Sequence, residues 1–463
     1  MNRVNFLLRS VTLAAAFVFS AQIHSAPKSQ SDSIVVLISV DGLAAYYFED
    51  PKAEMPNIRA LAKAGARASS MKAVTPTVTW PNHTTLVTGV MPARHGVVGN
   101  NFYDRKTKKN VTLIFDPVYD KEEIIKVPTI YDAAKASGMQ TAAVNWPASR
   151  NAPTLDWTIP EVRIQETYFK YVKPSFLEEC NKNGISLMEE IFPGNVRDTG
   201  AKSDEAYTRV VNMVINKHRP QLALFHIGNV DHVEHEQGPK SKEAYAAIKV
   251  ADAEVGAIWK ELQRDFPGKA TLLVVSDHGF SPIKSMILPN VVLRQAGLIE
   301  VDKKKITRES VHLVTQGGAA MLYVMDEKNR KSVIEKVQKA FHNVKGVAKV
   351  VGPDQLKDYG VAIPKDDPNA PDMILFAKLG YSFGDTAAGE LPFNEKPERF
   401  GSHGHDPAIP ELHATFVAWG AGIKAGAQLG EIENIDVAPT MAKLLKIPFP
   451  SADGKPLSAI LAD

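Results

Sequence analysis

The sequence has one cysteine, no excess of charge of either sign and, beyond its first residues, no long hydrophobic run. A single thiol, Cys180, cannot form an intramolecular disulfide. Lysine and arginine together number 54 and aspartate and glutamate 52, so the chain lacks the basic balance that is typical of nucleic-acid-binding proteins. We therefore expect no nucleic-acid-binding surface.

The apolar run at the N-terminus is short. Arg3 and Arg9 flank its start, residues 11–19 are apolar, and small residues follow up to residue 26. This order is typical of a secretory signal peptide, and the run is too short to span a bilayer, so residues 1–26 are predicted to be removed on export. No later segment reaches transmembrane length, which predicts no membrane span in the mature chain. An exported chain without disulfides suggests a bacterial periplasm, or secretion.

Apolar runs that alternate with helical patterns make up most of the remaining chain. Residues 33–40, 221–227 and 270–275 are continuous apolar stretches, which are typical of strands buried on both faces. Residues 242–265 have the apolar period of a long amphipathic helix. Such alternation predicts an α/β fold with a mostly parallel central sheet and helices on both faces.

A threonine-rich stretch contains the candidate nucleophile. In the sequence TWPNH, which begins at Thr79, Pro81 fixes φ and disfavours helical conformation at Trp80, so a bend is predicted before a helix over residues 84–90. A hydroxyl at such a bend, near the free N–H groups of a helix start, is well placed to attack an electrophile. A capped threonine-proline turn without any chemistry is the alternative interpretation.

Aspartate and histidine recur just past predicted strands or in glycine-flanked loops. The residues are Asp41, Asp231 with His235, Asp277 with His278, and His403. In open α/β sheets ligands bind outside the carboxyl ends of strands, and a spacing of four places Asp231 and His235 on one face of a helix. Carboxylate and imidazole ligands without a thiolate suit Zn²⁺, and Mn²⁺ or Fe²⁺ are chemically possible. For any one pair, a turn aspartate beside a surface histidine is the alternative.

Taken in order along the chain, these motifs carry a resemblance. The series is Asp41-Gly, Thr79-x-Pro-Asn-His, Asn100, Asp231-x-x-x-His235, Asp277-His278-Gly and His403-Gly-x-Asp406. It is similar to the motif series of the alkaline phosphatase superfamily. Within that superfamily the chain most resembles the type I phosphodiesterase, or nucleotide pyrophosphatase/phosphodiesterase, family. The resemblance extends over most of the mature chain.

The resemblance implies an alkaline-phosphatase-like fold, and with it a division of the chain. We expect the catalytic domain to consist of residues 30–300 and 370–463. The irregular, aromatic-rich residues 151–200 are predicted to be an inserted cap near the active face rather than part of the sheet. Residues 306–365 are predicted to form a small α/β insertion.

The resemblance also implies a site with two zinc ions. One ion would be held by Asp231, His235 and His403, and the other by Asp41, Asp277 and His278 together with the Thr79 hydroxyl. Thr79 would attack phosphorus to form a phosphothreonine, while Asn100 and the backbone N–H of Trp80 would bind a phosphoryl oxygen.

Two substrate-binding residues are predicted with an alternative for each. Relatives commonly have phenylalanine directly after the threonine, whereas this chain has Trp80, whose indole could stack on a base or another flat leaving group. A packed core aromatic is the alternative. Arg150 could bind the second charge of a phosphate monoester, as cations do in related monoesterases, and a solvated surface arginine is the alternative.

The sequence therefore favours an exported two-metal phosphodiesterase or nucleotide pyrophosphatase acting on small phosphodiester or nucleotide substrates. A phosphomonoesterase or phosphonate hydrolase on the same scaffold is the alternative among enzymes. A sulfatase is disfavoured because it needs a modified Cys or Ser in a Cys/Ser-x-Pro-x-Arg context, which Cys180 lacks. A catalytically silent envelope binding protein is also disfavoured, because it would have no need of Thr79 beside the metal ligands.

Overall fold

Strand β1 (Ile34–Val40) shows why the chain folds in layers. All of its side chains are buried. Val36 and Ile38 pack into a hydrophobic cluster on one face of the sheet, whereas Val35 and Leu37 pack into a separate cluster on the other face. Because successive side chains of a strand point to opposite faces, a strand that is apolar throughout must be covered on both.

The computed structural model describes residues 33–114 and 119–462. The predicted signal peptide, residues 1–26, lies outside the described residues. Among the helices in the described part of the chain, none is long and apolar enough to cross a membrane.

The central sheet has eight strands. Their spatial order is β20 (Ala427–Glu433), β2 (Ala66–Lys72), β19 (Phe416–Gly420), β8 (Ala270–Val275), β1, β7 (Leu222–Ile227), β5 (Thr141–Trp146) and β6 (Trp157–Pro160). Neighbouring strands are parallel except at β19, which is antiparallel to both β2 and β8. The predicted fold class, an α/β fold with a mostly parallel sheet, is confirmed.

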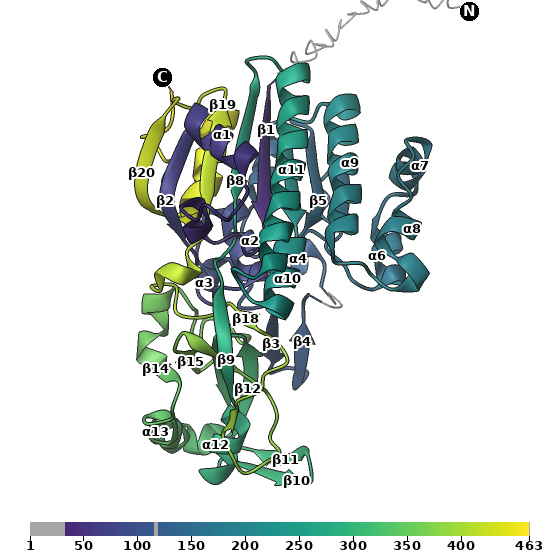
Figure 1. Ribbon diagram of the computed structural model, residues 1–463. Helices are drawn as coiled ribbons and strands as arrows, with labels where there is room; N and C mark the ends of the chain where they lie inside the picture. The colour runs from purple at the N-terminus through teal and green to yellow at the C-terminus, as the bar shows by residue number, and fades with distance from the viewer. Residues whose placement is uncertain (1–32, 115–118, 463) are drawn as a thin grey trace, which may run out of the picture. The chain divides into compact units, whose positions relative to one another are not determined.

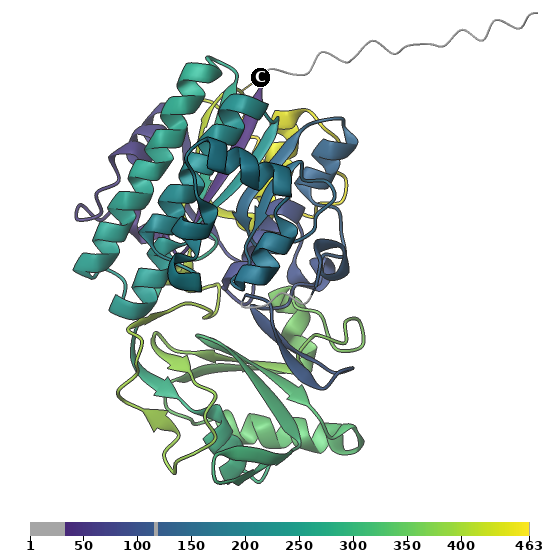
Figure 2. The same ribbon diagram turned by 90° about the vertical axis from the view of Figure 1, so that its right-hand side faces the viewer.

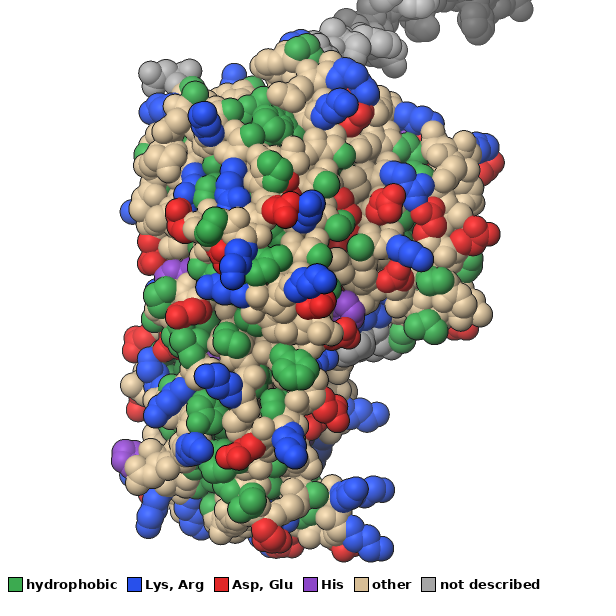
Figure 3. Space-filling view, in the orientation of Figure 1, with side chains coloured by type: hydrophobic (Ala, Val, Ile, Leu, Met, Phe, Trp, Pro, Cys, Tyr) green, Lys and Arg blue, Asp and Glu red, His purple; other side chains and the backbone are tan. Residues whose placement is uncertain are grey.

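Helices cover both faces of this sheet (Figure 1, Figure 2). One face carries α1 (Pro56–Ala64), α9 (Ala201–His218) and α11 (Lys242–Asp265). The other carries α2 (Thr79–Thr88), α5 (Ile130–Ala136) and α14 (Val437–Leu445). Acidic and basic side chains are interspersed over the upper part of the face seen in Figure 3, rather than gathered into one basic stripe there.

A second, antiparallel sheet consists of β12 (Val311–Gln316), β13 (Ala319–Val324), β15 (Met373–Ala377) and β14 (Val347–Val351), in that spatial order. Helix α13 (Arg330–Phe341) packs on it. Strand β15 follows the predicted insertion boundary at residue 365, in a part of the chain expected to belong to the catalytic domain, and it pairs with β13 and β14. The sequence of a short apolar strand does not indicate which sheet the strand joins.

Smaller elements complete the described chain. They are α3 (Pro92–His95), β3 (Asn101–Asp104), β4 (Lys109–Thr112), α4 (Lys121–Ile124), α6 (Gln165–Tyr171), α7 (Pro174–Lys182), α8 (Leu187–Ile191), α10 (Asn229–Gln237), β9 (Ser281–Ile287), α12 (Pro289–Gln295), β10 (Ile299–Asp302), β11 (Lys305–Glu309), β16 (Gly380–Phe383), β17 (Phe393–Asn394) and β18 (Gly401–Ser402). Of these, β16, β17 and β18 all pair with β9.

Two local expectations need correction. Residues 157–160, expected in a cap outside the sheet, form the edge strand β6 beside β5. Helix α2 begins at Thr79 and includes Trp80, although the residue before a proline was expected to be non-helical. Pro81 is tolerated because it is the third residue of the helix, where a backbone N–H has no intrahelical partner to lose.

A buried pair of carboxyl groups lies between helices α9 and α11. Asp204 accepts hydrogen bonds from the backbone N–H groups of Gly228 and Asn229, at 3.1 and 2.8 Å, and thereby caps the start of α10. Glu254 is buried, and neither of its carboxyl oxygens has a hydrogen-bond partner among the described residues. Burial, followed by the charge of Asp204, raises the pKa of Glu254 to about 9. Glu254 is therefore protonated at neutral pH.

This pair predicts a pH-dependent stability. The folded state keeps a proton on Glu254 that the unfolded state releases near its ordinary pKa of 4.5, so wild-type stability falls as pH rises from about 4.5 to about 9. Glu254→Gln removes this dependence. The variant should gain free energy of unfolding relative to wild type across that range, by up to about 1.4 kcal/mol for each pH unit.

Urea unfolding at pH 5, 6.5 and 8 measures the difference. Glu335→Gln, at an exposed position of α13, is the matched control and should show no such trend. A difference between Glu254→Gln and wild type that does not change with pH would contradict the assignment of the proton to Glu254.

Candidate active site

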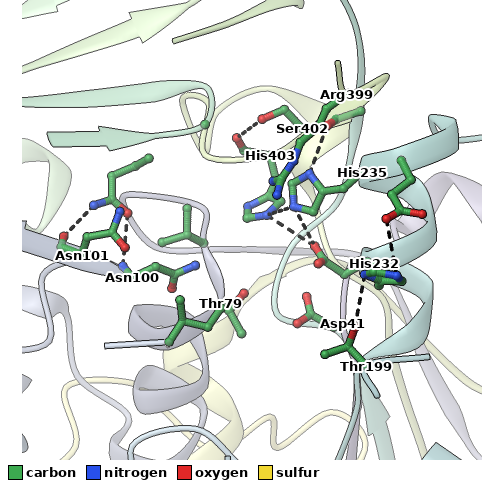
Figure 4. A pocket seen from close by; sticks show the side chains of 18 of the residues that line it. Asp41, Thr79, Asn100, Asn101, Thr199, His232, His235, Arg399, Ser402 and His403 are labelled. Atoms are coloured by element: carbon green, nitrogen blue, oxygen red, sulfur yellow. Dashed lines mark hydrogen bonds and ion pairs between the residues drawn. The ribbon is translucent and has the colours of Figure 1, made fainter. Parts of the chain in front are cut away.

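The candidate site lies where three adjacent parallel strands end. Asp41 follows β1, Asp231 lies one helical turn beyond β7, and Asp277 follows β8. Because β8, β1 and β7 are neighbours in the sheet, their carboxyl ends bring these three segments together. His403 joins them from a distant loop, and Thr79 from the start of α2 (Figure 4).

The first aspartate–histidine group contains Asp231, His235 and His403. Their ligand atoms lie within 4.8 Å of one another. Asp231 Oδ1 is 3.5 Å from His235 Nε2 and 3.4 Å from His403 Nε2, and the two Nε2 atoms are 3.1 Å apart. Asp231 and His235 are both on α10, as their spacing predicts.

The tautomers of these two histidines follow from their backbone partners. His235 Nδ1 lies 3.1 Å from the carbonyl of Gly401, and His403 Nδ1 lies 2.9 Å from the carbonyl of Thr77. Because a carbonyl oxygen only accepts, both Nδ1 atoms carry the proton and both Nε2 atoms present lone pairs to each other. Burial lowers the pKa of His235 to about 3 and that of His403 to about 4, so both rings are neutral.

The second group contains Asp41, Asp277 and His278, which are almost completely buried. His278 Nε2 is 3.4 Å from Asp41 Oδ1 and 3.2 Å from Asp277 Oδ2, while its Nδ1–H donates to the carbonyl of Gly279 at 3.1 Å. Burial, and then the charge of a neighbouring aspartate, raises the pKa of both Asp41 and Asp277. Two carboxyl groups so close to each other in the interior are ionised together only beside a compensating cation.

Both groups fit a divalent metal ion. Among the described residues, buried ligand atoms of both groups have no hydrogen-bond partner: Asp41 Oδ1, Asp231 Oδ1, Asp277 Oδ2 and His278 Nε2. In each histidine the other ring nitrogen is fixed by a backbone carbonyl, which is the usual arrangement of a histidine that binds a metal. Mixed carboxylate and imidazole donors suit Zn²⁺.

Thr79 and Asn100 lie beside these groups. Both line the same cavity, of about 840 Å³, together with Asp41, Asp231 and His403. The backbone N–H of Trp80, expected to bind substrate, donates instead to Asn100 Oδ1 at 2.8 Å. This hydrogen bond fixes the orientation of the Asn100 amide, because Oδ1 is the acceptor and Nδ2 remains the donor.

Neither of the two predicted substrate-binding side chains lies in the cavity wall as the structure describes it. Trp80 is 2% exposed, packs among Val97, Val98 and Phe102, and donates from Nε1 to Glu161. It is therefore a packed core aromatic, the alternative that the sequence left open. Arg150 is buried against Asp120 at 2.8 Å and over the ring of Tyr171, so it lies outside the cavity lining and is not a solvated surface residue.

Three arginines that the sequence analysis did not identify line the cavity. They are Arg163, Arg197 and Arg399. The charge of Arg163 partly offsets the rise in the pKa of Asp41, and it adds to the fall in the pKa of His235 that burial causes. These two residues belong to different aspartate–histidine groups. Glu161 lies in the same wall and contributes to raising the pKa of Asp41. The signal was available, since Glu161 and Arg163 lie within three residues of the end of β6, but that strand was not predicted.

Two further buried histidines, His226 on β7 and His83 on α2, lie next to the carboxyl groups of the second aspartate–histidine group. His226 Nε2 lies 3.0 Å from Asp41 Oδ2, and its Nδ1 lies 3.1 Å from the carbonyl of Asn145. His83 Nδ1 lies 2.9 Å from the carbonyl of Thr79 and 3.5 Å from Asp277 Oδ2. A histidine inside an otherwise apolar strand was the sequence signal for His226.

Known proteins resemble this chain over nearly its whole length. The sequence model of the family "Type I phosphodiesterase / nucleotide pyrophosphatase" matches residues 35–406. The venom phosphodiesterase of Naja atra is 25% identical over 432 residues, which are 92% of this chain and 46% of that protein. Ectonucleotide pyrophosphatase/phosphodiesterase family member 1 of Homo sapiens is 27% identical over 89% of this chain and 40% of its own. The chain thus spans less than half the length of these relatives.

Solved structures show the same fold. Human ectonucleotide pyrophosphatase/phosphodiesterase 5 superposes with a TM-score of 0.69 at 20% identity, covering 93% of this chain and all of that one. An inactive form of the murine protein, in complex with AMP, superposes with a TM-score of 0.67 at 19% identity. The alkaline-phosphatase-like fold that the sequence resemblance implied is confirmed.

The two aspartate–histidine groups predict metal content. Purified protein should contain about two divalent ions per chain, and Asp277→Asn should lower this to about one, because it replaces a ligand of a single group. A chelator should lower the Tm, since ions that bind only the folded state stabilise it, and Zn²⁺ should restore the Tm. Elemental analysis and thermal unfolding measure both effects. Metal-free protein with an unchanged Tm in chelator would contradict the site.

Proposed function

Because the chain belongs to the type I phosphodiesterase / nucleotide pyrophosphatase family, we propose that it is a phosphoric ester hydrolase that cleaves phosphodiester or phosphoanhydride bonds. The reaction proceeds through a phosphothreonine on Thr79, and the protein is exported. One observation carries the proposal: the Thr79 hydroxyl, the Asn100 amide and members of both aspartate–histidine groups line a single cavity. A binding protein would have no need of that hydroxyl among the ligands.

The chain supplies the nucleophile and a donor for the phosphoryl group. Thr79 Oγ forms a bond to phosphorus as the bond to the leaving oxygen breaks, and water then cleaves the Oγ–P bond and regenerates threonine. Divalent ions held by the two groups would lower the pKa of the hydroxyl and offset negative charge on the phosphoryl oxygens. Asn100 Nδ2 donates to one of those oxygens, and its Oδ1 is held by the Trp80 N–H.

The cavity favours a diester over a monoester. A diester has one negative charge at phosphorus and a second substituent that needs room, whereas a monoester gains from extra cations. The cavity of about 840 Å³ has an apolar wall made by Ile283, Met286 and Phe383. The three arginines of the lining, Arg163, Arg197 and Arg399, favour a phosphomonoesterase, which is the second candidate function. Glu161 in the same wall opposes a second negative charge on the substrate. A structural neighbour in complex with AMP supports small nucleotide substrates.

Removal of the Thr79 hydroxyl tests the covalent step. Thr79→Ala should lose several orders of magnitude in kcat while keeping its metal and its Tm, because only the nucleophile is removed. Thr79→Ser should keep part of the activity. Thr88→Ala removes a buried hydroxyl from the other end of the same helix and is the matched control, expected to stay active. Turnover by Thr79→Ala near the wild-type level would exclude the phosphothreonine.

Paired aryl esters test the preference for diesters. We expect kcat/KM for bis-p-nitrophenyl phosphate to exceed that for p-nitrophenyl phosphate by at least roughly tenfold, a barrier difference of about 1.4 kcal/mol. Arg163→Ala should lower monoester hydrolysis more than diester hydrolysis, whereas Arg150→Ala, whose guanidinium is engaged by Asp120, should leave the ratio unchanged. A monoester preference that Arg163→Ala abolishes would identify a phosphomonoesterase.

A further inference from the structure

We propose that Gln316 is a positioning residue that holds Asn100 in place from the second sheet. The inference rests on the function proposed above, in which Asn100 binds a phosphoryl oxygen. Gln316 is the last residue of β12 and is 3% exposed. Its Oε1 accepts from the backbone N–H of Asn100 at 3.1 Å, and its Nε2 donates to the backbone carbonyl of Asn101 at 2.6 Å. One side-chain amide thus binds the backbone N–H of Asn100 and the backbone carbonyl of Asn101, the next residue (Figure 4 labels both asparagines).

The residues just before Asn100 lie outside regular structure, whereas Asn101 begins β3, which pairs with β4. Residues 96–99 belong to no helix or strand. Asn100 itself has two further hydrogen bonds, from the Trp80 N–H to its Oδ1 and from the Leu113 N–H to its carbonyl at 2.9 Å. Gly99 lets the Gln316 side chain come this close to the backbone, because a Cβ on residue 99 would lie 2.7 Å from Gln316 Nε2. Gln316 therefore adds two side-chain hydrogen bonds to the contacts that set the backbone position of Asn100.

The turn of residues 316–318, which begins with Gln316, also contacts the loop that carries His403 of the first aspartate–histidine group. Gly318 donates its backbone N–H to the carbonyl of His403 at 2.7 Å. Gly317 has φ of +67°, and a Cβ there would lie 2.4 Å from that carbonyl, while a Cβ on Gly404 would lie 1.8 Å from the carbonyl of Gln316. The turn 316–318 thus lies between Asn100, the proposed hydrogen-bond donor to the phosphoryl group, and the loop of His403 in the first aspartate–histidine group. It fixes the distance between them, although no atom of it belongs to either.

Loss of these contacts should affect the transition state more than substrate binding. A donor aimed at a developing charge is effective only at hydrogen-bond distance, and small misplacements lower rates strongly. Gln316→Met keeps the length and packing of the side chain but removes both hydrogen bonds. We expect it to lower kcat for a diester by about 10- to 100-fold and to change KM less than threefold.

A double-mutant cycle separates positioning from a general loss of stability. If Gln316 acts through Asn100, then Gln316→Met should have no further effect on kcat in an Asn100→Ala background. The matched control is Gln355→Met, which removes the hydrogen bond of an exposed glutamine to the backbone N–H of Gly352. Its kcat should equal the wild-type value. Additive losses from Gln316→Met and Asn100→Ala would overturn the inference, as would wild-type kcat in Gln316→Met.

Hydrogen exchange provides a readout that does not need turnover. Peptides covering residues 97–104 should exchange faster in Gln316→Met than in wild type or Gln355→Met, because the Asn100 N–H loses its acceptor. Unchanged exchange there overturns the positioning role whatever the activity. If wild type hydrolyses no diester but Gln316→Met still accelerates exchange, the proposed function is refuted. The positioning of the Asn100 backbone by Gln316 is then still supported.

Discussion

The rest of the structure depends on one constraint: the buried carboxyl and imidazole groups of the two aspartate–histidine groups direct their lone pairs toward one another. Asp41 and Asp277 bring two carboxylates to one small volume, and His235 and His403 present facing Nε2 atoms 3.1 Å apart. Bringing such groups together without a cation is unfavourable, because each carboxylate is desolvated and repelled by the other. These groups meet at the strand ends, where helix starts and glycine turns bring four separate segments together.

Each of these segments is held by hydrogen bonds outside the ligand set. Asp204 caps helix α10, which carries Asp231 and His235. The carbonyl of Thr77 fixes the ring of His403, so a residue two positions before the nucleophile sets the tautomer of a ligand from a distant loop. This hydrogen bond joins the backbone that precedes the nucleophile directly to a ligand of the first aspartate–histidine group.

Particular residues show how far sequence reasoning reached. The central strands β1, β7 and β8 and the helical pair Asp231–His235 followed from period and composition, since a run of buried β-branched residues or a four-residue spacing has few other solutions. Strands β6 and β15 were misplaced because strands of four or five residues carry too little pattern to name their sheet. Trp80 and Arg150 were proposed as substrate-binding residues by analogy with related enzymes, but a corresponding position along the chain does not set a side chain's direction.

The sequence by itself determined the chemistry of the site: the oxygen and imidazole donors, the threonine hydroxyl, and the α/β framework whose strand ends present them. Only the tertiary structure decided which charged and amide groups surround that chemistry. Arg163 enters the cavity from beyond an edge strand, and Gln316 reaches Asn100 across 216 positions of sequence. The physical reason is that periodicity and spacing are properties of the local backbone, whereas the partner of a buried polar group is set by sheet order and by the packing of segments far apart in the chain.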